Sequence, residues 1–142
     1  MEIDLALLAD AATVDASGKL NILGVFDRIS ASGFPARHPH VSLVLRFGAS
    51  MTEAGEHKVD ISLRDPDGGE VVRLNGEIKV GAGSVASGGM VRVPQVVNMD
   101  RLVFEKPGRY SFDVSVDGEH QVSVPLFLHE AGPKPRGPLA QA

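Results

Sequence analysis

The sequence predicts an all-β protein, an antiparallel β-sandwich of about eight strands. Apolar and polar residues alternate along most of the chain, which is the pattern of half-buried strands. Turn sequences rich in glycine and proline, such as DPDGG and EKPG, separate these runs. No run has the spacing of roughly 3.6 residues that marks an amphipathic helix, so the strands are expected to pack against one another.

The predicted strands begin with an N-terminal pair, residues 2–9 and 19–29, and end with a hairpin in residues 107–129. Between them, Gly76 suggests a bulge in its strand, and Pro94, which cannot donate a ladder hydrogen bond, places its strand at a sheet edge. The runs between the two pairs are SLVLRFG (42–48), GEHKVDISLRD (55–65), VVRLNGEIKV (71–80) and MVRVPQVVNM (90–99).

The closing hairpin carries two apolar rows that should face the same side of the sheet. A two-residue Asp117-Gly118 turn would set Val114 opposite Gln121 and turn one row toward solvent. We therefore predict a three-residue loop of Val116, Asp117 and Gly118, with glycine at the left-handed position. The rows are Tyr110, Phe112, Val114 and Val116, and Val122, Val124, Leu126 and Leu128.

Length and composition limit the domain organisation and the partners. The chain has 142 residues, which fits one domain over residues 1–129, followed by a flexible Pro/Gly-rich tail at 130–142. The net charge of -4 disfavours nucleic-acid binding, and the absence of cysteine suits a reducing compartment. The acidic start lacks the features of a signal peptide, and no apolar run approaches the ~20 residues of a membrane span. We expect a cytoplasmic protein with no membrane contact.

Two resemblances follow from particular segments. PGRY, residues 107–110, resembles the entry to a late strand of an immunoglobulin-like sandwich, where a tyrosine hydroxyl often bonds nearby backbone; the cysteine pair and the tryptophan of true immunoglobulin domains are absent. Over residues 3–128 the chain resembles a family of small bacterial proteins catalogued only as a domain of unknown function. This resemblance implies a single cytoplasmic β-sandwich without catalytic residues, and it rests on LLADAATVDASGKLNILGVFDRI, FPARHPHVSLVLRF, ISLRDPDG, VPQVVNM and the PGRY segment.

The candidate metal ligands are His38 and His40, whose side chains would project to the same side of an extended chain. No third ligand accompanies them, and prolines 35 and 39 explain the segment as a rigid connector. DPDGGE, residues 65–70, begins like a calcium loop but has Gly69 at its fifth position, so we interpret it as a turn. We expect no metal and no other cofactor.

Catalytic and phosphate-binding motifs are also missing. GAGSVASGG, residues 81–89, matches neither common phosphate-loop pattern and is expected to be a flexible loop. Ser87 has Gly89 after it but Val85 before it, so it does not fit G-x-S-x-G. We expect no catalytic residues and no enzymatic activity.

The N-terminal pair is apolar on both faces, which an antiparallel sheet rarely is unless both faces are covered. We expect Ile3, Leu5 and Leu7 to face the core, and the cover of the other face to be the 31–40 loop or a second copy of the protein. Self-association is the favoured prediction. The chain is thus predicted to be a non-enzymatic interaction or structural module that binds itself or another protein; the alternative is a small-molecule or carbohydrate binder that uses its end loops. The predicted interface residues are Leu8, Leu23, Val25 and Ile29.

Overall fold

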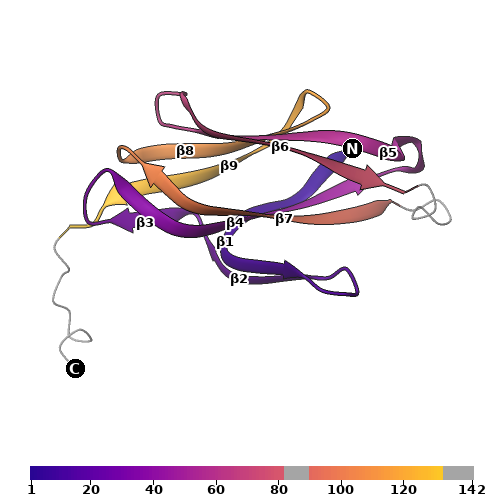
Figure 1. Ribbon diagram of the computed structural model, residues 1–142, viewed down its shortest axis with the longest axis horizontal. Helices are drawn as coiled ribbons and strands as arrows, with labels where there is room; N and C mark the ends of the chain where they lie inside the picture. Colours follow the sequence, from indigo (N-terminus) through magenta and orange to yellow (C-terminus); the bar gives the residue numbers. More distant parts are fainter. Residues whose placement is uncertain (82–89, 133–142) are drawn as a thin grey trace.

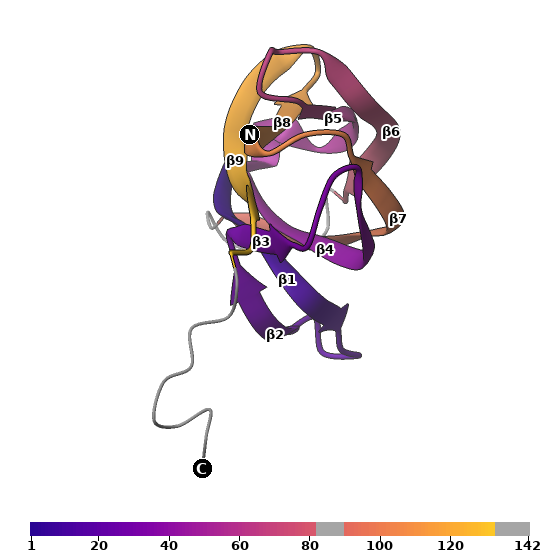
Figure 2. The same cartoon turned by 90° about the vertical axis from the view of Figure 1, so that its left-hand side faces the viewer.

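The computed structural model describes residues 1–81 and 90–132, which form two β-sheets packed face to face (Figures 1 and 2). The all-β prediction is confirmed, with nine strands in the described residues rather than about eight, because Asp27 separates β3 from β2. A short 3-10 helix, η1 (Met51–Glu53), joins β4 to β5. The strands are β1 (Glu2–Val14), β2 (Leu20–Phe26), β3 (Arg28–Ala31), β4 (Ala36–Ala49), β5 (Gly55–Arg64), β6 (Glu70–Val80), β7 (Val91–Phe104), β8 (Gly108–Val116) and β9 (Glu119–Glu130).

One sheet has the strand order β2-β1-β4-β7 and the other the order β3-β9-β8-β5-β6. All pairs are antiparallel except β3–β9, which is parallel. The inner faces bury a core in which the rings of Phe104 and Tyr110 meet edge to face, 5.0 Å apart between centroids. The largest fully buried side chains include Tyr110, Phe47, Phe104, Phe112, Leu8, Leu43, Leu45 and Leu63.

The tyrosine interaction expected from PGRY is present. The Tyr110 hydroxyl donates a hydrogen bond to the carbonyl oxygen of Lys106 at 2.7 Å, and burial raises the pKa of this hydroxyl. The hydroxyl therefore ties the β7–β8 connection to the core. The immunoglobulin-like designation itself stays a prediction.

The closing hairpin corrects one prediction. Its turn has two residues, Asp117 and Gly118, with φ angles of 51° and 83°, as a type I′ turn requires. The expected three-residue loop is wrong, because a bulge restores the register: Ser115 pairs with His120 and Val114 with Val122, which leaves Gln121 as the extra residue. Both apolar rows face the core, as expected.

Other register details differ from the expectation for the middle strands. Gly76 pairs regularly with Val59, so the predicted bulge there is wrong; the irregularity in this pair of strands lies between Leu63 and Arg64. The strand containing Pro94, β7, is an edge strand as predicted.

The N-terminal strand presents the predicted face at Ile3, which packs against the core, but the opposite face from Leu5 onward. A register shift between Ile3 and Leu5 reverses the alternation. Leu8, expected on the outer face, is therefore in the core with 1% exposure, and Leu5 and Leu7 are partly buried on the other face.

The predicted 81–89 loop and the 130–142 tail fall mostly outside the described residues. At the border of the tail, β9 continues through Glu130, and the amide of Ala131 donates to the carbonyl of Ala31 at 2.7 Å. Within residues 1–81 and 90–132, no helix has the length and apolar character that a bilayer crossing requires.

Candidate functional site

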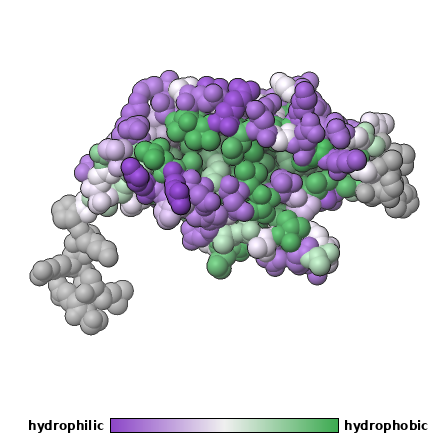
Figure 3. All heavy atoms as spheres, in the orientation of Figure 1, coloured by the Kyte–Doolittle hydropathy of each residue, from purple (hydrophilic) through white to green (hydrophobic). Residues whose placement is uncertain are grey.

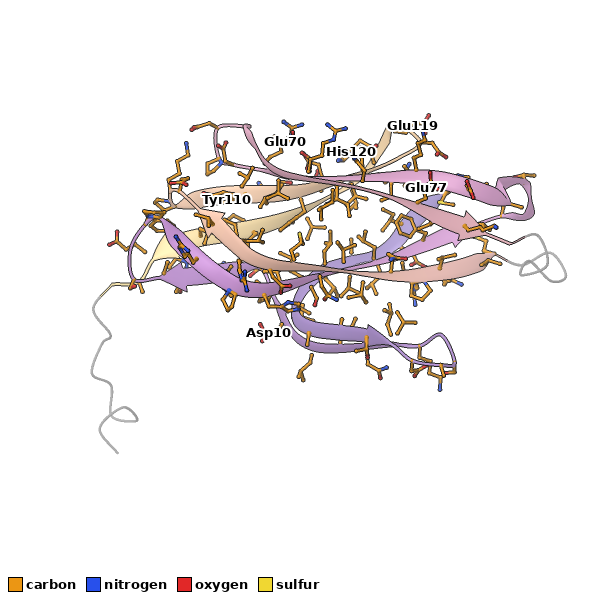
Figure 4. All side chains as sticks on the ribbon, viewed as in Figure 1. Asp10, Glu70, Glu77, Tyr110, Glu119 and His120 are labelled. Atoms are coloured by element: carbon orange, nitrogen blue, oxygen red, sulfur yellow. The ribbon has the colours of Figure 1, made fainter. Side chains whose placement is uncertain are left out.

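The β1–β2 hairpin leaves its sheet and lies below the rest of the sandwich (Figures 1 and 2). It bends where Asp10 faces Gly24, whose φ of 72° is left-handed (Asp10 is labelled in Figure 4). Beyond the bend, Leu20 and Ile22 face Leu5 of the sheet across a cleft. On the same outer face, Val44 has no exposed surface, and the hairpin lies on that side of the sheet (Figures 1 and 2). Residues 36–40 of the expected covering loop belong to strand β4 instead.

The predicted interface residues are divided by this arrangement. Leu23 and Val25 flank the bend and are 72% and 63% exposed. Leu8 is buried in the core, so its assignment to the interface is wrong. Ile29 packs partly against the core from β3, so it offers little surface to a partner.

The edge strand β2 differs from the other sheet edges in its lack of protection. Natural edge strands carry charges, prolines or bulges that discourage pairing with another chain. The sequence of β2, LNILGVF, has neither charge nor proline. The other edges are protected by Arg28 on β3, by Glu70, Arg73, Glu77 and Lys79 on β6, and by Arg92, Pro94 and Asp100 on β7.

A polar ladder on the outer face of β4 and β7 has the residue types of a hydrolytic triad. His40 Nδ1 lies 2.6 Å from Asp100 Oδ1, and His40 Nε2 lies 3.1 Å from the Ser42 hydroxyl. No sequence motif indicates this ladder. His40 and Ser42 are two residues apart on β4, and they pair with Asp100 and Asn98, which are two residues apart on β7.

The geometry does not support nucleophilic catalysis by this ladder. Ser42 has no exposed surface, and its hydroxyl donates to Asn98 Oδ1 at 2.8 Å, so its single hydrogen is directed away from His40. These residues also lie within paired strands, whose ladder occupies the backbone amides that an oxyanion site would use. The arrangement is a cross-strand hydrogen-bond ladder.

His38 and His40, the candidate metal ligands, have separate environments. Both nitrogen atoms of His40 are engaged by Asp100 and Ser42. His38 lies against the Phe26 ring at 5.9 Å, and desolvation by burial lowers its pKa. In the part of the chain that the structure describes, no three His, Cys, Asp or Glu residues form a group suited to a metal ion.

A groove of about 360 Å³ opens between the edge strands β6 and β7. Apolar residues gather between these strands in the space-filling view (Figure 3). Gly76 leaves room at this groove, since a Cβ there would meet no atom within 4 Å. Glu77, labelled in Figure 4, is the charged residue in the lining. The apolar side chains in the lining are Leu45, Phe47, Val59, Ile61, Leu74, Ile78, Val96 and Val97.

A comparison with curated proteins gives no match. A family model matches residues 4–129, which is most of the chain. The protein therefore belongs to the family of unknown function DUF6941.

Proposed function

We propose that the protein is a non-enzymatic interaction module that associates with a second copy of itself through the edge of β2. The observation that carries this proposal is the combination of an unprotected edge strand with the exposed side chains of Leu23 and Val25. The cytoplasmic location and bacterial origin implied by the family resemblance belong to the same proposal.

Pairing of two β2 edges suits a symmetric dimer. Antiparallel strands related by a two-fold axis form a self-complementary contact. Among the residues that the structure describes, β2 has one neighbour in its sheet, β1, so its other edge is available for hydrogen bonds. Because β2 is uncharged, two copies can approach there without like-charge repulsion, despite the net charge of -4. The contact would cover Leu23 and Val25, which the monomer leaves in solvent.

Light scattering across a concentration series tests this proposal. We expect the wild type to form a dimer and the Leu23→Asp/Val25→Asp variant to be a folded monomer, because a buried interfacial charge is costly whereas an exposed one is not. Val71→Asp is the matched control, since Val71 is also an exposed apolar residue of an edge strand but lies in the other sheet. A wild type that stays monomeric at the highest concentration contradicts the proposal.

Small-molecule binding is the second candidate function. The β6–β7 groove is a better candidate site for it than the end loops. An engineered apolar cavity of about 150 Å³ accepts benzene, so a groove of about 360 Å³ has room for a two-ring molecule. Carbohydrate is disfavoured, because the Phe127 ring that could stack on a sugar is covered by the guanidiniums of Arg28 and Arg109 at 5.9 and 5.7 Å.

The neutral fluorophore N-phenyl-1-naphthylamine tests the groove. We expect saturable binding to the wild type and loss of binding in Gly76→Leu, whose side chain would occupy the groove. Gly33→Leu is the control, because a Cβ at Gly33 also meets no atom within 4 Å but does not belong to the groove lining. Equal affinity in wild type and Gly76→Leu would rule the groove out as the site.

A further inference from the structure

The cleft between the β1–β2 hairpin and its own sheet has an amphipathic lining. Its volume is about 540 Å³. One part of the lining is apolar, with Leu20 and Ile22 from the hairpin and Leu5 and Pro94 from the sheet. The charged residues in the lining are all basic, namely Lys19, Arg46 and Arg92. This concentration of positive charge contrasts with the net charge of -4 on the whole chain.

Asp4 holds the two arginines side by side. Arg46 Nε donates to one carboxylate oxygen at 2.8 Å, and Arg92 Nε donates to the other at 2.7 Å. Both hydrogen bonds use Nε, so the Nη groups of each guanidinium are further donors for an anion. One carboxylate thus positions two guanidiniums and neutralises half of their charge.

We infer that this cleft binds an anionic amphiphile, a small molecule with one anionic group and an apolar body. The anion would lie between the guanidiniums of Arg46 and Arg92 and the ammonium of Lys19, and the apolar body would lie against Leu20 and Ile22. Charge complementarity selects this ligand over a neutral or cationic one. This site uses other side chains of β2 than the proposed dimer contact, because Leu23 and Val25 do not belong to the lining.

The ligand would bridge two elements that meet across the cleft. Lys19, Leu20 and Ile22 come from the hairpin, whereas Arg46 and Arg92 come from β4 and β7. A molecule bound to both sides stabilises the folded state by mass action. It should therefore raise the melting temperature of the protein, which gives a second measurement of binding.

Fluorescence titration with 8-anilinonaphthalene-1-sulfonate, an anionic amphiphile, tests the inference. We expect saturable binding to the wild type, weaker by at least about tenfold in Arg46→Gln/Arg92→Gln, since charge-assisted hydrogen bonds are the strong ones. Lys19→Gln changes an exposed residue of the turn and leaves Asp4 and its arginines intact, so it should weaken binding by only about threefold, the usual size of an exposed charge interaction. Raising the salt concentration should also weaken it.

Matched controls distinguish binding in this cleft from binding elsewhere on the protein. Arg73→Gln should keep wild-type affinity, because Arg73 lies in the other sheet. Arg73 is a matched control for Arg92, since both are ion-paired and their side chains are 54% and 57% exposed. Gly76→Val should also bind normally, because it alters only the β6–β7 groove. Equal loss in Arg73→Gln, loss in Gly76→Val, or absence of saturable binding would overturn the inference. Circular dichroism and melting curves check that each variant is folded.

Discussion

Gly24→Ala should destabilise the protein by displacing the β1–β2 hairpin. Gly24 has a φ of 72°, and this left-handed conformation costs an L-residue about 1–2 kcal/mol. The new methyl group would also overlap Oδ2 of Asp10 and lie 2.9 Å from its Cγ. The Asp10 side chain must therefore leave its position, at a cost of about 0.5–1.5 kcal/mol if it is forced off its rotamer.

Together these effects predict a loss of about 2–3 kcal/mol in the free energy of unfolding. Urea titration followed by circular dichroism measures this loss, at one fixed protein concentration because dimerisation would add to the apparent stability. The hairpin should also become more accessible, so proteolysis within residues 10–26 should be faster than in the wild type.

The double variant Asp10→Ala/Gly24→Ala separates the two contributions. Removing the carboxylate should recover about 1 kcal/mol, because only the backbone strain and a contact at 3.1 Å with the Asp10 Cβ would remain. Gly33→Ala, where the glycine is not left-handed and has open space around it, controls for the glycine effect in general. A Gly24→Ala loss below about 1 kcal/mol, or no recovery in the double variant, would refute the reasoning.

Three further predictions concern single side chains. Tyr110→Phe removes the hydroxyl that bonds the Lys106 carbonyl, so we expect a loss of about 1–2 kcal/mol in urea titration, and an unchanged midpoint would contradict this. Gly76→Val should stabilise the protein by about 1 kcal/mol, because valine favours a strand and its methyl groups enter the groove; a lower melting temperature would show that the groove is not open. The hydrogen bond from Arg46, which has the larger effect, and the one from Arg92 lower the pKa of Asp4. The ionised Asp4 carboxylate therefore contributes fully to stability above about pH 4, and this contribution is lost as the pH falls through the lowered pKa. Melting curves of Asp4→Asn should therefore differ from wild type at about pH 6 and converge with it at the lowest pH; a constant difference would contradict the assignment.

The strands could be predicted because alternation reports burial directly. The rows that contain Phe112 and Val124 face the core as expected, and Pro94 marks an edge strand. The register could not be predicted in full, because a single extra residue reverses every side chain that follows it. Gln121 is such a residue in the closing hairpin, and the shift between Ile3 and Leu5 placed Leu8 in the core rather than at an interface.

The candidate sites were harder to predict because they join residues distant in sequence. Asp4, Arg46 and Arg92 lie on three strands, and nothing local to any of them indicates that one carboxylate holds two guanidiniums. The ladder of His40 with Asp100 depends in the same way on the pairing of β4 with β7. Such constellations become visible once the strand order is known.

The surplus of apolar residues in the N-terminal hairpin is only partly explained by the monomer. Folding of the hairpin under its sheet accounts for Leu20 and Ile22, which line the cleft. It does not account for Leu23 and Val25, which stay in solvent on the edge strand that has neither charge nor proline. Scattered apolar residues on a surface need no explanation, but two on an unprotected strand edge are a template for strand pairing. The same hairpin therefore provides a wall of the basic cleft and the proposed dimer contact, and the Leu23→Asp/Val25→Asp variant should lose the second while it keeps the first.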